Sequence, residues 1–137
     1  MNNIKSFFIE KINEVRDLLN KTDDPPLQAE CIRSLADTTT FIRHYSYKPA
    51  YIALDFAMSV GSRMIASALE RGRYYKREET LKFVKEYLTL LTDSIDDEAK
   101  IKDLVCRYIA FAFTTTPPGI VALKNGKIEK FWGDIIP

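Results

Sequence analysis

Apolar residues recur at spacings of three and four from the start of the chain to residue 113, which is the period of an α-helix that buries one face. Pro25, Pro49, Gly72 and the acidic run that begins at Asp96 interrupt this pattern in the ways that start or end helices. The sequence therefore predicts five helices, over residues 3–20, 25–45, 50–71, 76–95 and 96–113.

Three consecutive threonines, Thr38-Thr39-Thr40, lie inside the second of these helices. β-Branched residues lose side-chain freedom in a helix, and a run of them weakens the local helical preference. The sequence therefore predicts a kink in this helix, or its early end, near Thr40.

The helix expected over residues 50–71 is unusually apolar, since Asp55 and Arg63 are its only charged residues between Ala50 and Leu69. A helix that is apolar on nearly every side belongs in the core of a bundle or at an interface between subunits. Small residues follow one side of it at spacings near four, and such a side lets another helix approach closely. Three of these small residues are candidates for self-association: Ala53, Ala57 and Gly61.

The period changes after residue 116, where two short apolar runs flank Asn125-Gly126. Asn-Gly between such runs is a strong signal for a two-residue hairpin turn, which would pair Leu123 with Ile128 and Ile120 with Phe131. A lone hairpin is marginally stable in water, so this one is expected to dock on the bundle, pair with a copy of itself or extend another sheet. Leu123, Ile128 and Phe131 are therefore further candidates for self-association.

The predicted fold is thus all-α, a compact bundle of about five helices with a small C-terminal β-hairpin. A length of 137 residues suits one such unit with a sizeable core. The expected division is a helical bundle over residues 1–116 and a hairpin tail over residues 117–137, docked on the bundle or on a partner.

One run of the sequence, between the third and fourth predicted helices, combines cations with aromatic rings. Cationic side chains can hold phosphates, and tyrosine rings can stack on bases. The candidate nucleic-acid-binding residues are Arg71, Arg73, Tyr74, Tyr75, Lys76 and Arg77. The run is also typical of a solvated loop between helices, because arginines favour a helix C-terminus and neighbouring glutamates neutralise much of the charge.

A second basic and aromatic stretch, residues 43–48, precedes the helix 50–71. Because a helix of that length spans about 30 Å, the two stretches are expected at opposite ends of an up-and-down bundle. The same alternation places Asp23-Asp24 near the first stretch and residues 96–98 near the second. Each end then mixes charges, which weakens the case for nucleic acid and leaves open a head-to-tail assembly of complementary ends.

The overall charge is balanced, with 20 Lys and Arg against 19 Asp and Glu, which argues against a generally basic nucleic-acid coat. Charged residues interrupt the apolar positions of residues 1–20, so no signal peptide is expected. Asp55 and Arg63 lie in the longest weakly charged stretch, so no membrane span is expected either. The sequence favours a cytoplasmic protein, and its single glutamine, Gln28, beside many charges follows a thermophile trend.

The inventory of reactive side chains favours no metal and no cofactor. Cys31, Cys106 and His44 are too few for a structural zinc site, and both cysteines are expected to be reduced, packed thiols. His44 is the only conventional base near neutral pH, and no nucleophile is tied to it by spacing. Asp55 and Arg63 are typical of structural ion pairs, so an enzyme that uses them or His44 is only the third hypothesis.

The leading expectation is a non-enzymatic helical interaction module that self-associates, with a dimer favoured. Such a module would serve as a small subunit of a larger assembly or as a viral or archaeal accessory protein. The alternative is a nucleic-acid-binding module that uses the basic and aromatic run at residues 71–77. The two differ in their response to salt, because phosphate contacts weaken steeply as salt rises.

Overall fold

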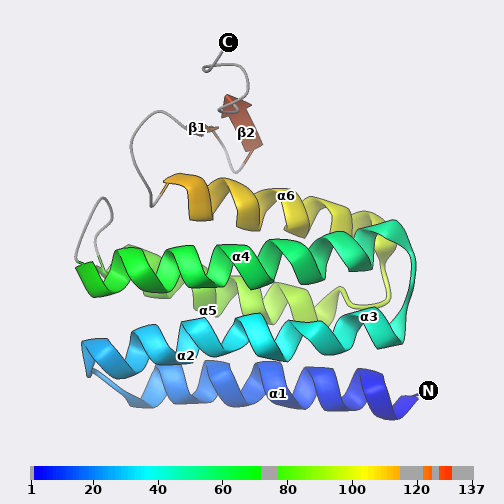
Figure 1. Ribbon diagram of the computed structural model, residues 1–137, viewed down its shortest axis with the longest axis horizontal. Coiled ribbons are helices and arrows are strands. Elements are labelled where there is room, and N and C mark those ends of the chain that lie inside the picture. The colour runs from blue at the N-terminus through cyan, green and yellow to red at the C-terminus, as the bar shows by residue number, and fades with distance from the viewer. Residues whose placement is uncertain (1, 72–76, 115–121, 125–126, 131–137) are drawn as a thin grey trace.

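Long helices run back and forth along one common direction in the computed structural model of the chain (Figure 1). The structure describes residues 2–71, 77–114, 122–124 and 127–130. Within that part the five predicted helices are confirmed, the second of them as a segment of three consecutive pieces. The helices are α1 (Asn2–Lys21), α2 (Pro25–Thr38) with its continuation through η1 (Thr39–Phe41) into α3 (Ile42–Tyr45), α4 (Pro49–Arg71), α5 (Arg77–Asp93) and α6 (Glu98–Thr114).

The predicted break near Thr40 is confirmed by the 3₁₀ turn η1. The hydroxyl of Thr39 donates to the carbonyl of Leu35 at 2.9 Å, and the hydroxyl of Thr40 donates to the carbonyl of Asp37 at 2.7 Å. Hydroxyl groups that bond to the preceding turn compete with the backbone ladder and bend helices. The threonine run therefore tightens the helix for one turn, and the chain then continues as α3.

Helix α4 is the central element of the bundle, as its sequence predicts. It lies between α2 and α6, α1 lies on the outer side of α2, and α5 lies behind this layer (Figure 1). However, only 12 of its 23 residues are buried, so an apolar sequence on nearly all sides has not led to burial on all sides.

The core is contiguous and reaches all the long helices. Aromatic rings fill it between α5 and α6, where Phe83 stacks on Phe111 with ring centroids 3.8 Å apart. The hydroxyl of the buried Tyr87 donates to the carbonyl of Leu104 at 2.6 Å, so this ring is inside without an orphaned polar group. Of the two cysteines, Cys31 is buried as expected, and the expectation that Cys106 is packed is wrong because its position on α6 is exposed.

Two short strands follow the helices, β1 (Ala122–Lys124) and β2 (Lys127–Lys130). They pair antiparallel with Leu123 opposite Ile128. The turn at residues 125–126 and the expected pair Ile120 and Phe131 lie outside the described residues. The docking of the tail, and its division from the bundle at residue 116, therefore stay predictions.

Among the described residues, α4 is the one helix whose length and hydropathy would suffice to cross a membrane. Half of its most apolar stretch is buried inside the fold. The core helix of a soluble protein can meet the same criterion, so this property alone does not indicate a membrane span.

Candidate functional site

The small residues of α4 are used inside the chain, where they let α6 approach. A β-carbon added at Gly61 would lie 2.9 Å from the ring of Tyr108 and 3.4 Å from the β-carbon of Ala112. Ala57, one turn earlier, is also buried. The predicted close approach of a second helix is confirmed, and the helix that makes it belongs to the same chain. Of the three candidate small residues, only Ala53 is exposed.

A row of bulky apolar side chains stands on the exposed side of the same helix. Ile52, Phe56 and Val60 are 44%, 70% and 41% exposed. Their spacing of four places them along one line of the helix surface, and we call these three residues the α4 ridge. Single exposed apolar residues are ordinary on protein surfaces, whereas large contiguous apolar patches are typical of interaction sites. The sequence does not indicate the ridge, because every side of α4 is apolar and the exposed side has no distinguishing pattern.

A shallow, almost wholly apolar groove runs along the ridge, between α4 and α6. It has a volume of about 70 Å³. The ridge residues Phe56 and Val60 form one wall. The remaining lining residues are Ala57, Gly61, Met64, Ile109, Ala112 and Phe113. A projecting row and a groove therefore lie side by side on one face of the molecule.

Arg63 lies on the exposed side of α4 and is engaged by its own helix. Its guanidinium donates to the carbonyl of Ser59 at 3.1 Å and to the hydroxyl of Ser59 at 2.9 Å. The expectation that Arg63 forms a structural ion pair with a neighbouring helix is therefore wrong, since its described partner is Ser59 of the same helix.

Asp55 points to the inside and forms an ion pair with α3. Its Oδ2 lies 3.3 Å from Nε of Arg43, and its Oδ1 is buried with no hydrogen-bond partner among the described residues. Burial raises the pKa of Asp55, and its charge attraction and hydrogen bond to Arg43, with a smaller effect of His44, oppose this shift without cancelling it. The expected structural ion pair of Asp55 is confirmed, with an exposed arginine as the partner.

No catalytic cluster forms around the residues that the enzyme hypothesis singles out. His44 and Arg63 are exposed, and Asp55 is buried in a separate ion pair. Within residues 2–71, 77–114 and the two strands, no group of three or more metal-ligating side chains lies together.

At the end of the bundle that carries the run 71–77, one cation of the run, Arg77, bonds to residues near the start of α2. Arg77 donates to the side-chain oxygen of Gln28 at 2.8 Å and to the carbonyl of Asp23 at 2.6 Å. The predicted proximity of Asp23 to this run is thus confirmed, and the guanidinium of Arg77 holds α5 against the α1–α2 corner. Arg71 is exposed at the end of α4, while Arg73, Tyr74, Tyr75 and Lys76 lie outside the described residues.

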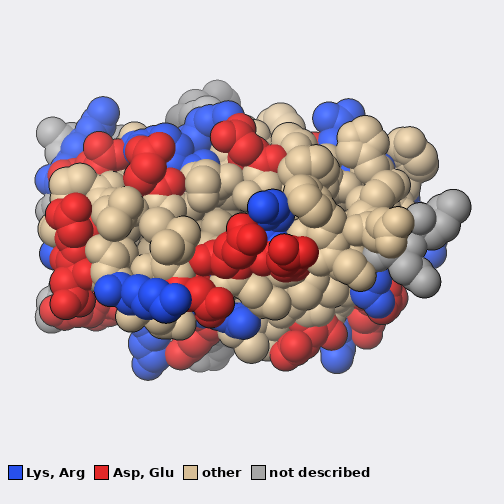
Figure 2. Space-filling view, turned by 90° about the horizontal axis from the view of Figure 1, so that it is seen from below, with Lys and Arg blue, Asp and Glu red and all other residues tan. Residues whose placement is uncertain are grey.

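Charges of both signs are interspersed on the face that α1 presents (Figure 2). Ion pairs contribute to this pattern, such as Lys11 with Glu14 at 3.3 Å. Interspersed charges produce no extended positive field of the kind that attracts a nucleic-acid backbone. This face offers no support for a nucleic-acid interface.

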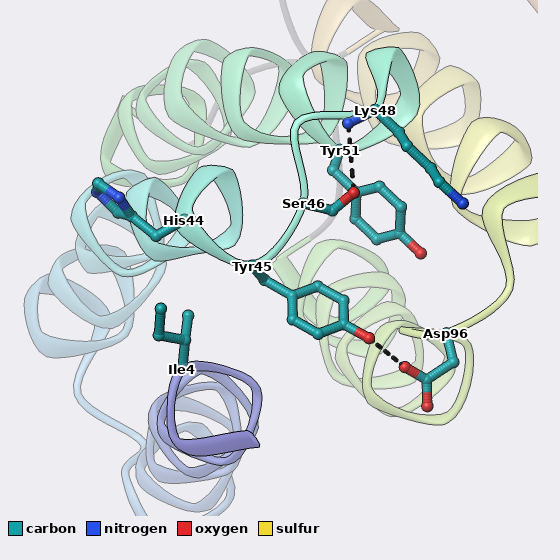
Figure 3. A pocket seen from close by; sticks show the side chains of 7 residues that line it. All are labelled: Ile4, His44, Tyr45, Ser46, Lys48, Tyr51 and Asp96. Atoms are coloured by element: carbon teal, nitrogen blue, oxygen red, sulfur yellow. Dashed lines mark hydrogen bonds between the residues drawn. The ribbon is translucent and has the colours of Figure 1, made fainter. Parts of the chain in front are cut away.

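At the opposite end, the stretch 43–48 meets the loop between α5 and α6, as predicted. The carboxylate of Asp96 accepts a hydrogen bond from the hydroxyl of Tyr45 (Figure 3). It also accepts one from Lys5. These two bonds hold the pKa of Asp96 below its usual value. The helix expected from residue 96 begins two residues later, at Glu98, because Asp97 accepts the amide of Lys100 at 3.2 Å and caps α6.

The fold and these surfaces define a five-helix bundle with an exposed apolar ridge on its central helix and mixed charge at its ends. Comparison of the chain with protein-family models, with curated proteins and with solved structures gives no match. The function must therefore be argued from the surfaces themselves.

Proposed function

We propose that this chain is a non-enzymatic interaction module that associates with a second copy of itself through the α4 ridge. The observation that carries the proposal is the 70% exposure of Phe56 in the middle of a row of apolar side chains. Exposing this ring to water is unfavourable by roughly 25 cal/mol for each Å² of apolar surface. A partner that covers the ridge removes this surface from water.

A second copy suits the ridge because a projecting row and a recess lie side by side on the same face. In a two-fold arrangement each partner uses the same patch, so a projecting row needs a recess beside it. The α4 ridge has such a recess in the groove toward α6. Rows of side chains spaced by four on two helices interdigitate in the commonest class of helix packing. Ala53, small and exposed next to Ile52, leaves room for the approaching helix.

The test compares Phe56→Lys with Leu18→Lys by sedimentation velocity over a range of protein concentrations. Leu18 on α1 is 52% exposed and lies outside the ridge, which makes it a matched control. We expect the wild-type mass to rise with concentration toward twice 15.8 kDa. Phe56→Lys stays monomeric at the same concentrations, because a lysine ammonium resists burial in an apolar contact. Leu18→Lys associates like the wild type.

Two outcomes would contradict the proposal. One is a wild-type chain that remains monomeric at the highest concentration it tolerates. The other is an equal loss of association in both variants, which would point to a general effect of added charge. Unchanged thermal unfolding of dilute Phe56→Lys shows that the fold is intact.

The C-terminal hairpin remains a second proposed contact for self-association, through Leu123, Ile128 and Phe131. Its support is the sequence pattern, since a lone hairpin needs a partner surface. Deleting residues 118–137 separates the two contacts. If association through the α4 ridge is sufficient, the shortened chain retains the wild-type concentration dependence, whereas loss of association assigns the contact to the tail.

Nucleic-acid binding through residues 71–77 stays the alternative prediction. It would require Arg71 and the segment 72–76 to act without Arg77, whose guanidinium already has two partners. Retention of the chain by single- or double-stranded nucleic acid at low salt, lost as salt rises, would support it. Absence of binding at low salt would eliminate it.

A further inference from the structure

We infer that the groove between α4 and α6 binds a segment of its own chain, residues 131–137, while the chain is monomeric. Phe56 and Val60, which form one wall of this groove, are exposed, so its rim is open to an occupant. Residues 131–137 lie outside the described residues and directly follow β2. The contact rests on the surface of the proposed function, because a second copy that uses the groove has to displace the segment.

The groove has the size and the lining of a site for a peptide side chain. Its volume of about 70 Å³ is far below the range of about 300–1,000 Å³ found for small-molecule sites. One water occupies about 30 Å³ of liquid, so the groove has room for an aliphatic side chain and not for a metabolite. Every lining residue among those described is apolar. An apolar side chain that projects from an extended segment therefore suits the groove.

The two strands bring the chain close to this groove. Both lie beside the C-terminal half of α6, the half that supplies Ile109, Ala112 and Phe113 to the groove (Figure 1). Ala110 lies two positions from Tyr108 and from Ala112, so it stands on the side of α6 that faces away from α4. It is nevertheless fully buried, which agrees with strands that cover this outer side of α6.

Residues 131–137 are long enough to reach the groove from the end of β2. Strand β2 ends at Lys130, beside α6. Seven extended residues span at most roughly 25 Å. A helix with its side chains is only about 10–12 Å wide. The segment can therefore cross α6 from its outer side and still lie along the groove of the same chain.

The segment has the composition to cover an apolar surface. Trp132, Ile135 and Ile136 are bulky and apolar. Removing such side chains from water is favourable by roughly 25 cal/mol for each Å² of apolar surface. An isoleucine side chain suits the small recess, and the indole ring of Trp132 is large enough to cover the exposed ring of Phe56.

Charge fixes the position of the segment along the groove. Asp134 is its one charged side chain, and Arg63 is exposed on α4 one turn after Val60. The bonds of Arg63 to Ser59 both use Nη1, and a guanidinium has five N–H donors. Arg63 can therefore also donate to the carboxylate of Asp134. A surface ion pair adds little affinity, so its role here is to set the register of the segment.

The experiment measures the fluorescence of Trp132, the single tryptophan of the chain, in dilute full-length protein. We expect emission at shorter wavelength, and weaker quenching by acrylamide, than in a synthetic peptide of residues 127–137, because the docked indole is shielded from water. Phe56→Lys lowers the ratio of docked to free segment at least about tenfold, because it removes the main apolar contact. Leu18→Lys, exposed outside the groove, keeps the wild-type emission.

Two results with these variants would refute the contact. One is a wild-type emission equal to that of the peptide. The other is a shielded Trp132 that Phe56→Lys leaves shielded, which would place the indole on another surface.

A charge exchange between Arg63 and Asp134 tests the register without touching the apolar wall. Arg63→Asp should increase the quenching of Trp132, because two carboxylates then face each other. Adding Asp134→Arg restores the pair and the shielding. A double variant that is no better shielded than Arg63→Asp alone would overturn the placement of Asp134 beside Arg63.

The dependence on concentration separates this contact from the proposed self-association. A segment held by its own chain is shielded at the lowest concentration and becomes exposed as a second copy displaces it. Shielding that arises only as the chain associates would place the segment in the partner's groove. That result would overturn the contact within one chain and leave self-association standing. A chain that stays monomeric with a shielded Trp132 would support the contact and refute self-association.

Discussion

Helix α4 has two sides that are equally apolar in sequence and opposite in use. On one side Gly61 lies so close to α6 that the ring of Tyr108 fills the space a β-carbon would take. On the other side Phe56 projects into solvent with most of its ring uncovered. The difference shows that small and bulky apolar residues on such a helix indicate different things. Small residues indicate where another element approaches, and uncovered bulky residues indicate where one is still required.

The inner side of α4 also carries polar side chains that are buried, so their hydrogen-bond partners must come from the protein and not from water. Ser62 is fully buried and its hydroxyl lies 2.7 Å from the hydroxyl of Tyr108. Asp55 is buried with one of its two carboxylate oxygens unpartnered. The packing on this side is therefore specific, and changes there are expected to alter the stability of the fold. Changes on the α4 ridge are expected to alter association instead.

The largest effect is expected from Gly61→Leu. The new side chain has to enter space that the ring of Tyr108 and the methyl group of Ala112 already occupy. Overpacking of this kind costs typically 1–3 kcal/mol, and a whole isobutyl group against a ring and a second helix places the loss at about 3 kcal/mol of unfolding free energy. Urea denaturation measures it.

Ala53→Leu is the matched control for Gly61→Leu, since it places the same side chain on the exposed side of α4. Its unfolding free energy should stay within about 0.5 kcal/mol of the wild type. A similar loss in both variants would mean that the two sides of α4 do not differ in packing, contrary to the comparison.

A smaller effect is expected from Tyr108→Phe, at about 1.5 kcal/mol. The ring remains in place against Gly61, and the hydroxyl of the buried Ser62 loses its partner. Adding Ser62→Ala removes the orphaned hydroxyl, so the double variant should be less destabilised than the sum of the two single changes. Strictly additive losses in this double-mutant cycle would show that the two hydroxyls do not interact.

The helices could be predicted from the sequence because their ends are decided locally. Pro25, Pro49 and the threonines before α3 act on the turn in which they lie, and the structure places breaks at all three. The start of α6 was missed by two residues, because Asp96 and Asp97 are both good caps by type. In the structure Asp97 accepts the amide of Lys100, while the carboxylate of Asp96 accepts bonds from Lys5, 91 positions away, and from Tyr45.

The surfaces could not be predicted in the same way, because they depend on which elements become neighbours. Phe56 and Leu54 are both large apolar residues of α4, yet one is 70% exposed and the other fully buried. Likewise the partners of Arg77 lie about fifty positions earlier in the chain, so no local pattern indicates that its charge is used. Periodicity identifies a helix, but the burial of each side depends on tertiary contacts.

Asp55→Asn is expected to stabilise the fold by about 1 kcal/mol near neutral pH. A buried ionised carboxylate with an unpartnered oxygen loses more hydration than an exposed arginine restores. Burial raises the pKa of Asp55 above its value in the unfolded chain, so the folded state binds the proton more readily. Its contribution therefore destabilises the fold above the folded-state pKa and fades as the pH falls through that value.

The measurement for Asp55→Asn is the difference in unfolding free energy between variant and wild type, near neutral pH and in mild acid. Other carboxylates, such as Asp96 with its lowered pKa, act with the opposite sign but cancel in this difference. The advantage of the variant should shrink in acid. An advantage that grows in acid would show that the pair with Arg43 outweighs the burial of Asp55.

The smallest effect on the fold is expected from Ile52→Ala on the α4 ridge, at about 0.5 kcal/mol in dilute solution. Ile65, of the same residue type on the same helix, is fully buried, and its replacement by alanine should cost about 3 kcal/mol because it leaves a cavity. At concentrations where the chain associates, the cost of Ile52→Ala should rise, because association buries this side chain while the position of Ile65 is unaffected. If Ile52→Ala costs the same unfolding free energy at all concentrations, the α4 ridge is not the contact for self-association.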